Sequence, residues 1–119
     1  MKELNLQTGK IGEKIAEEYL KKQGCKTIER NFKTKYAEID LISRKGKELV
    51  FVEVKTRRGE MFGTPEESLN KKKLRKLWLN AQGYINRKKW QGSYRIDAVC
   101  IVLNQDNTVN RLNHYPNII

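Results

Sequence analysis

Residues 38–55 read EIDLISRKGKELVFVEVK, and this stretch decides the fold. Two apolar runs flank a turn around Gly46, so the segment predicts a β-hairpin. The second run would be an ordinary buried strand without Glu53 and Lys55. Because side chains alternate along a strand, both charges fall on one face. Burying either charge without a partner costs several kcal/mol, so the pair needs a physical explanation.

Asp40, on the first strand of the hairpin, supplies one possible partner. Folding about the turn brings Asp40 opposite or diagonal to residues 51–53, within reach of Glu53. Two adjacent carboxylates repel each other, and a divalent cation between them removes the repulsion. Oxygen ligands of this kind suit Mg²⁺ or Mn²⁺, and Lys55 could then stabilise charge that develops on a phosphate.

These residue types are therefore compatible with phosphodiester hydrolysis. A second interpretation is a cross-strand ion pair on a solvent-facing sheet, formed by Asp40, Glu53 and Lys55. From spacing alone the ion pair is the more common arrangement, because a D…ExK pattern is short and arises often by chance.

The hairpin lies within a longer alternation of elements. Apolar residues at helical spacing predict a helix over Thr8–Gln23 that ends at Gly24. Gly12 falls in the middle of its apolar face, where a missing side chain lets the helix approach a sheet closely. Strands are expected at 26–31, 36–43, 48–56 and 94–103, with an edge strand over 108–115.

A second helix is expected between Thr64 and about Lys88. Thr64 is a candidate N-cap, with Glu67 three residues on and Pro65 at the first helical position. Either one helix or a short turn followed by a longer helix fits this segment. The element order is then α-β-β-β-α-β with a final β, which predicts an α/β fold with a mixed sheet flanked by helices.

The length and composition predict one globular domain over residues 1–119. The chain is 38% hydrophobic and contains no repeat or Pro-, Gly- or Ser-rich linker. No apolar run approaches the roughly 20 residues that span a bilayer, and no signal-peptide core is present, so a cytoplasmic protein without membrane contact is expected. Cys25 and Cys100 lack metal-binding spacing and are predicted to be reduced structural thiols.

Charge gives the first indication of a partner. The chain has 25 Lys and Arg against 14 Asp and Glu, a net charge of +11. Residues 71–89 hold eight of these cations and no acid, whereas ten of the acids precede residue 61. Such segregation favours a polyanion-binding surface, with nucleic acid as the first candidate and an acidic membrane as the second. A merely soluble basic protein would carry the same net charge.

Several short motifs, each present once, follow one another in a specific order along nearly the whole chain. They are Gly9-x-x-Gly12-Glu13-x-x-Ala16-x-x-Tyr19-Leu20, Arg30-Asn31, Glu38-Ile39-Asp40-Leu41-Ile42, Val50-Phe51-Val52-Glu53-Val54-Lys55-x-Arg57, then Pro65, Lys73, Ala81, Tyr84 and Arg95-Ile96-Asp97. In this order the chain resembles the PD-(D/E)xK nuclease superfamily. More closely, it resembles the YraN-like family of uncharacterised bacterial proteins, relatives of archaeal Holliday-junction resolvases. Ala37 stands where that family usually has glycine.

The resemblance implies a restriction-endonuclease-like three-layer fold. It implies that Glu13, Asp40 and Glu53 bind Mg²⁺ or Mn²⁺, and that these three acids and the catalytic Lys55 form the active site. The implied activity is metal-dependent hydrolysis of phosphodiester bonds in DNA, including branched or structured DNA. A homodimer is expected by analogy with resolvases, which cut two strands symmetrically.

Two other functions stay open. One is a catalytically silent nucleic-acid-binding module on the same fold, for DNA or RNA, and the weaker one is a basic protein-interaction domain. Nucleic acid, DNA rather than RNA, is expected to contact six basic residues on the loop over 57–63 and the second helix. These are Arg57, Arg58, Lys71, Lys72, Lys73 and Arg75.

Four other polar or aromatic residues receive weaker assignments. Trp78 lies on the apolar stripe of the second helix and is predicted to be core, and Trp90 is expected to pack at the end of that helix rather than stack on bases. His114 has no visible partner for a metal site or a catalytic triad, and no role is predicted for it. Glu38 is predicted to be an exposed charge rather than a peripheral ligand.

Overall fold

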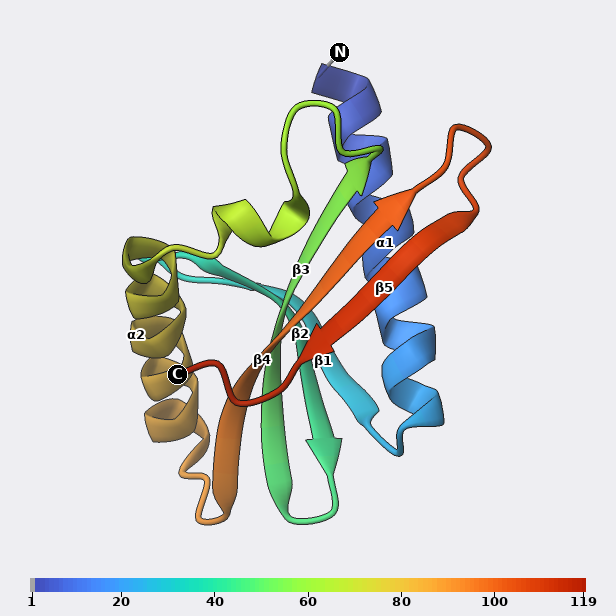
Figure 1. Ribbon diagram of the computed structural model, residues 1–119. Helices are drawn as coiled ribbons and strands as arrows, with labels where there is room; N and C mark the ends of the chain where they lie inside the picture. The colour runs from blue at the N-terminus through green and yellow to red at the C-terminus, as the bar shows by residue number, and fades with distance from the viewer. Residues whose placement is uncertain (1) are drawn as a thin grey trace.

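Two helices cover opposite faces of a five-stranded sheet (Figure 1). The computed structural model describes residues 2–119, with side chains from residue 4 onward. The elements are α1 (Lys2–Lys22), β1 (Lys26–Lys33), β2 (Glu38–Lys45), β3 (Glu48–Arg58), the 3-10 helix η1 (Pro65–Ser68), α2 (Lys71–Lys88), β4 (Ser93–Leu103) and β5 (Val109–Tyr115). The order α-β-β-β-α-β-β and the three layers confirm the fold class predicted from the sequence.

The strands lie in the order β1-β2-β3-β4-β5, and only β3 and β4 run parallel. The parallel pair extends over the whole of β3, from Glu48↔Ser93 to Arg58↔Leu103. In contrast, pairing between β2 and β3 ends at Leu41↔Val52, while β1 and β2 stay paired as far as Lys33↔Glu38. Beyond Leu41, β2 therefore leaves β3 and follows β1. We call this divergence the strand fork.

Alternating side chains of β3 build two separate cores. Val50, Val52 and Val54 face α1 and pack with Ala16 and Leu20. On the other face, Leu49 and Phe51 pack with side chains of α2, namely Leu77, Ala81 and Tyr84. Because both faces are covered, β3 is buried from residue 49 to residue 54, including Glu53.

Several element boundaries differ from those expected. Helix α1 begins at Lys2 rather than Thr8, because residues 4–7 continue the helix although they are exposed and show no apolar stripe. Arg57 and Arg58 belong to β3 rather than to a loop, since Val102 and Leu103 of β4 continue the parallel ladder beside them.

Of the two arrangements expected after Thr64, the structure has a short turn followed by a longer helix rather than one continuous helix. A short turn, η1, precedes α2, and the Thr64 side chain makes no capping hydrogen bond. Thr64 is thus the N-cap of η1, with Pro65 in its first turn as predicted, but its side chain forms no cap and it does not begin α2. Asn70 caps α2 instead, because its Oδ1 accepts a hydrogen bond of 2.9 Å from the Lys73 N–H.

Outside the hairpin, one side chain contradicts its prediction and another has partners that the sequence did not reveal. Trp78 is 40% exposed, because α2 packs on the sheet through Leu77 and leaves Trp78 beside that contact. His114 has partners from elements distant in sequence: its Nε2 lies 2.7 Å from Asp97 Oδ2 and its Nδ1 lies 3.2 Å from Tyr19 Oη. Asp97 is fully buried, so this network helps to join α1, β4 and β5.

Other expectations for single residues are confirmed. Trp90 packs at the end of α2, where its Nε1 donates to the Ser93 carbonyl at 2.9 Å. Cys25 and Cys100 are buried free thiols. Among residues 2–119, no helix is long and apolar enough to cross a membrane.

Gly12 is required where α1 crosses β3, and its replacement should destabilise the protein. A Cβ at residue 12 would lie 2.7 Å from Thr56 Cβ and closer still to Thr56 Oγ1. We expect Gly12→Ala to lower the free energy of unfolding by about 1–3 kcal/mol, because α1 must move off the sheet. Denaturant titration followed by circular dichroism measures this loss.

Gly9 is the matched control in the same helix. No atom lies within 4 Å of a Cβ added there, so Gly9→Ala should be neutral or stabilising by up to about 1 kcal/mol. Equal effects of the two substitutions would show that helix propensity, and not the contact with Thr56, decides the outcome.

Candidate metal centre

Asp40 lies at the strand fork and takes over a backbone hydrogen bond there. Its Oδ2 accepts from the Val54 N–H at 2.8 Å, just beyond the last β2–β3 pair at Leu41 and Val52. The carboxylate thus satisfies a donor of β3 that the departing strand leaves without a main-chain partner. Asp40 is 8% exposed and Glu53 is 3% exposed, so both acids are buried at the fork.

Two further carboxylates approach Asp40 from other elements. Oxygen atoms of Glu13, on α1, and of Glu38, on β2, lie within 4.8 Å of Asp40 and of each other. Asn31 holds these two acids together: its Nδ2 donates to Glu38 Oε1 at 2.7 Å and to Glu13 Oε1 at 3.2 Å. The close packing of Gly12 on Thr56 brings α1, and with it Glu13, to this position.

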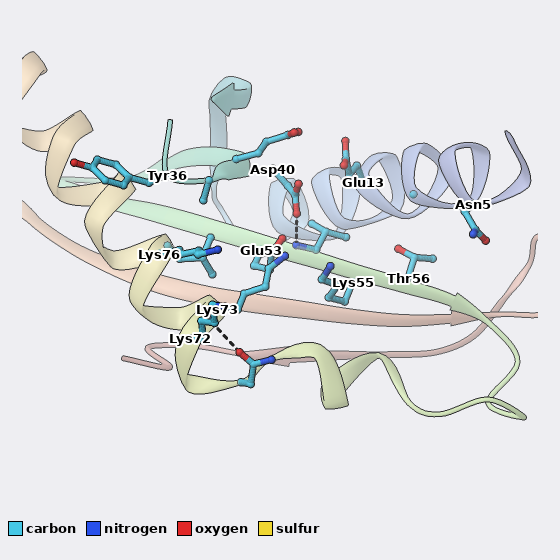
Figure 2. A pocket seen from close by; sticks show the side chains of 16 residues that line it. Asn5, Glu13, Tyr36, Asp40, Glu53, Lys55, Thr56, Lys72, Lys73 and Lys76 are labelled. Atoms are coloured by element: carbon cyan, nitrogen blue, oxygen red, sulfur yellow. Dashed lines mark hydrogen bonds and ion pairs between the residues drawn. The ribbon is translucent and has the colours of Figure 1, made fainter. Parts of the chain in front are cut away.

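Lysine side chains face the acids from β3 and α2 (Figure 2). Lys73 Nζ lies 3.2 Å from Glu53 Oε2, an oxygen that otherwise makes no hydrogen bond within the described part of the chain. Lys55 lines the same cavity from the strand that carries Glu53. Ammonium groups of the protein itself therefore lie beside the acids.

The crowding shifts the pKa of each group in a direction that burial and neighbouring charge explain. Burial, and then the adjoining Glu53, raise the pKa of Asp40. Burial also raises the pKa of Glu13, against the hydrogen bond from Asn31 that lowers it. Burial and the Lys73 ammonium lower the pKa of Lys55. For Lys73, burial alone would lower the pKa, but Glu53 and other site groups outweigh it and raise the pKa.

These residues line one cavity of about 630 Å³, which we call the acidic pocket. It unites the four predicted catalytic residues, Glu13, Asp40, Glu53 and Lys55. Lys72 and Lys73 also reach it, from the first turn of α2.

The other predicted nucleic-acid contacts lie elsewhere. Lys71 and Arg75 line a separate hollow beside Trp78. Arg58 donates from its Nε to Thr8 Oγ1 at 2.9 Å. Arg57 is exposed near the end of the ladder between β3 and β4. The predicted basic surface is therefore divided between two sides of α2 and the end of β3.

Sequence reasoning missed several residues at the pocket. Glu38 belongs to the carboxylate cluster, contrary to its assignment as an exposed charge. Asn31 bridges two acids from a backbone with φ of +51°, a conformation that asparagine tolerates better than most residues. Lys76 lines the pocket, and Lys10 and Lys14 line an adjoining hollow that shares Glu13 with it. Asn31 and Glu38 each stood in a motif of the sequence, whereas no motif marked Lys10, Lys14 or Lys76.

Nearly the whole chain matches known proteins. Residues 12–101 match the model of the uncharacterised protein family UPF0102. The chain belongs to the UPF0102 family. It is 44% identical to a UPF0102 protein of Caldanaerobacter subterraneus, with 98% of each chain covered. A UPF0102 protein of Clostridium tetani is 42% identical over 90% of this chain and 88% of its own, and one of Pelotomaculum thermopropionicum is 38% identical over 92% of each.

The donor set of this UPF0102 protein fits a hard divalent cation. Mg²⁺ and Mn²⁺ favour carboxylate oxygens and retain several waters, and the pocket offers carboxylates from three elements beside open volume. Glu53 Oε2 is a buried anionic oxygen whose neighbouring charge is a flexible ammonium 3.2 Å away. Burial, and then repulsion from Glu53, raise the pKa of Asp40, and a cation between the two acids would remove the repulsion.

Divalent cations should stabilise this UPF0102 protein through the acidic pocket. A ligand that binds only the folded state at 100 times its dissociation constant adds about 2.7 kcal/mol. We therefore expect millimolar Mn²⁺ to raise the melting temperature of metal-stripped wild type by several degrees, as measured by differential scanning fluorimetry. The increase should disappear in Asp40→Asn and Glu53→Gln.

Glu18→Gln is the control for this experiment, since Glu18 is an exposed acid on the same helix as Glu13. It should retain the full response to Mn²⁺. A response of wild-type size in Asp40→Asn would place the cation at another site.

Asp40→Asn should also stabilise the metal-free protein at high pH. Because the folded-state pKa of Asp40 is raised, its contribution to stability is present at acid pH and is lost as pH rises through that pKa. Asparagine keeps an acceptor for the Val54 N–H and carries no charge. The melting temperature of the variant in chelator should therefore exceed that of wild type increasingly from pH 5 to pH 9, by roughly 4 °C for each kcal/mol. A constant difference over this range would contradict the raised pKa.

Proposed function

We propose that this protein is an endonuclease that uses Mg²⁺ or Mn²⁺ to hydrolyse phosphodiester bonds in DNA, with branched or structured DNA as its substrate. The observation that carries the proposal is the convergence of Glu13, Asp40 and Glu53 on Lys55 at the strand fork. These residues come from three elements, and the whole-chain resemblance to PD-(D/E)xK nucleases assigns a catalytic role to each of the four.

Glu13, Asp40 and Glu53 would hold the cation, which supplies Lewis-acid polarisation of the phosphate when bound. The half-buried Lys55 points its ammonium into the same pocket and would stabilise negative charge that develops on the phosphate oxygens. Asn31 would orient Glu13, because its amide holds that carboxylate against Glu38. Burial at the fork excludes much of the solvent that would screen these charges.

Cations on both sides of the acidic pocket support a polyanionic substrate. Lys72 and Lys76 line the pocket from α2, and Lys10 and Lys14 line the adjoining hollow from α1. A nucleic-acid strand that crosses the pocket would meet ammonium groups before and after the acids, which compensates for the repulsion between carboxylates and phosphates. The net charge of +11 favours the same class of partner.

A catalytically silent nucleic-acid-binding module is the second candidate. The ion pair between Lys73 and Glu53 favours it, because this ammonium already balances part of the acidic charge without a metal. Such a module would keep its affinity for DNA or RNA in chelator and in Asp40→Asn, and its affinity would fall steeply with salt.

A cleavage assay separates the two candidates. Wild type with Mg²⁺ or Mn²⁺ should cut at least one of three end-labelled DNA substrates: a linear duplex, a flap and a four-way junction. Asp40→Asn and Lys55→Ala should each lower the rate at least 100-fold, because each removes a group that acts on the reacting phosphate. Binding measured in chelator should change far less.

Lys47→Ala is the matched control for Lys55→Ala. Lys47 is an exposed lysine in the turn at the opposite end of the same hairpin, so its loss should leave cleavage unchanged. Binding without cleavage of any substrate would favour the silent module. Cleavage that survives both Asp40→Asn and Lys55→Ala would reject the acidic pocket as the active site.

A further inference from the structure

The loop that follows β3 presents two large apolar side chains to solvent. Met61 is 87% exposed and Phe62 is 88% exposed, the highest values among the large apolar side chains that the structure describes. Single exposed apolar residues are common on protein surfaces, but two adjacent ones at a loop tip forgo the burial that such side chains favour. We call this pair the Met61–Phe62 tip.

The tip stands on an anchored loop. Arg111 of β5 donates to both Glu60 oxygens, at 3.2 and 3.0 Å, just before the tip. The same guanidinium donates to both Glu66 oxygens, at 2.9 and 2.7 Å, just after it. Tyr115 adds a hydrogen bond of 2.8 Å to Glu66. One arginine of the sheet edge therefore fixes both sides of the loop through bidentate contacts.

The loop also begins and ends in defined turns. The Gly59 N–H donates to the Leu103 carbonyl at 3.1 Å, and the Gly63 N–H donates to the Glu60 carbonyl at 3.2 Å. Both glycines have positive φ, +69° and +121°, which reverses the chain around the tip without steric cost. The loop that exposes the tip is therefore held in a defined conformation.

Strand β3 connects the tip to the acidic pocket. Because side chains of a strand point alternately to its two faces, Glu53, Lys55 and Arg57 share one face of β3. Arg57 is exposed. From Glu53 to Arg58 the strand rises about 16 Å, which corresponds to roughly five nucleotides along a duplex. In Figure 1 the loop lies directly beyond the end of β3, beside the first turns of α1. The bond between Arg58 and Thr8 ties this end of β3 to α1.

We propose that the Met61–Phe62 tip is an apolar wedge that inserts between bases of the bound nucleic acid at a branched or unpaired position. Methionine and phenylalanine are among the side chains that DNA-bending proteins insert between base steps. Arg57 contacts the backbone between the pocket and the wedge, and Arg111 is a positioning residue that keeps the wedge rigid. This proposal rests on the nucleic-acid binding in the proposed function but not on cleavage.

Two other occupants fit the tip less well. A specific interface between two copies buries about 800 Å² on each partner, and two side chains supply only a part of that area. The affinity of a surface segment for a membrane grows with the apolar area that it buries, and two side chains supply little of it. Stacked bases are apolar, and the phosphates beside them match Arg57.

The test measures base unstacking in chelator, where no cleavage takes place. The probes are a linear duplex and a flap that carries 2-aminopurine beside the branch point. Wild type should increase the 2-aminopurine fluorescence and bind the flap at least tenfold more tightly than the duplex. Met61→Ser/Phe62→Ser should lose the fluorescence increase and the preference, while its duplex affinity stays within threefold of wild type.

Two further variants separate the wedge from a change in stability. Met61→Leu/Phe62→Leu keeps an apolar wedge and should retain the fluorescence increase. Arg111→Lys keeps the charge but loses the paired contacts to Glu60 and Glu66, so its fluorescence increase should fall although the tip residues are unchanged. The serine variant should melt within about 2 °C of wild type, because both side chains are almost fully exposed.

The proposal would also be rejected if the serine variant bound the flap and increased the 2-aminopurine fluorescence as wild type does. An equal loss of affinity for flap and duplex, a loss of self-association in sedimentation with DNA binding unchanged, or a loss of binding to anionic vesicles alone would each overturn it. If wild type binds no DNA at all, the wedge and the proposed function both fail. If wild type unstacks the flap but never cleaves with metal, only the proposed catalysis fails.

Discussion

The hydrogen bond from the Val54 N–H to Asp40 Oδ2 is the interaction on which the rest of the site depends. Two strands of a sheet can separate only if the backbone groups at the separation find other partners. Asp40 supplies that partner with its side chain, so β2 can follow β1 while β3 stays paired with β4. The cost is a buried carboxylate beside Glu53. Asp40 thus allows β2 and β3 to separate, and it also places a buried carboxylate at the point of separation.

The charge balance at the strand fork explains why the acids can be buried in the free protein. A raised pKa allows Asp40 to retain its proton, and Lys73 places a positive charge next to Glu53. Both compensations are reversible: a proton can leave, and a lysine side chain can swing away on its flexible stem. A divalent cation could therefore replace them without any change in the strands. A permanent arginine in place of Lys73 would compete with the metal more strongly.

The sequence predicted the features that depend on local patterns, and it missed those that depend on contacts between distant segments. The hairpin, the shared face of Glu53 and Lys55 and the close approach at Gly12 follow from periodicity. The role of Asn31 follows from a left-handed backbone on β1 that places its amide between α1 and β2, which no local pattern reveals. The partners of His114 are also remote in sequence.

Strand β3 sets the geometry that any substrate would meet. Its parallel pairing with β4 is unbroken from Glu48 to Arg58, so the spacing between the acidic pocket and the Met61–Phe62 tip is fixed by a rigid element. Arg111 adds the second constraint, because it joins both sides of the loop to β5, the strand that pairs with β4. Glu53 and Lys55, the charged β3 residues of the pocket, and the tip therefore belong to one unit, β3–β4–β5. A ligand that engages both must adapt its own shape to that distance, and a branched nucleic acid bends more easily than a continuous duplex.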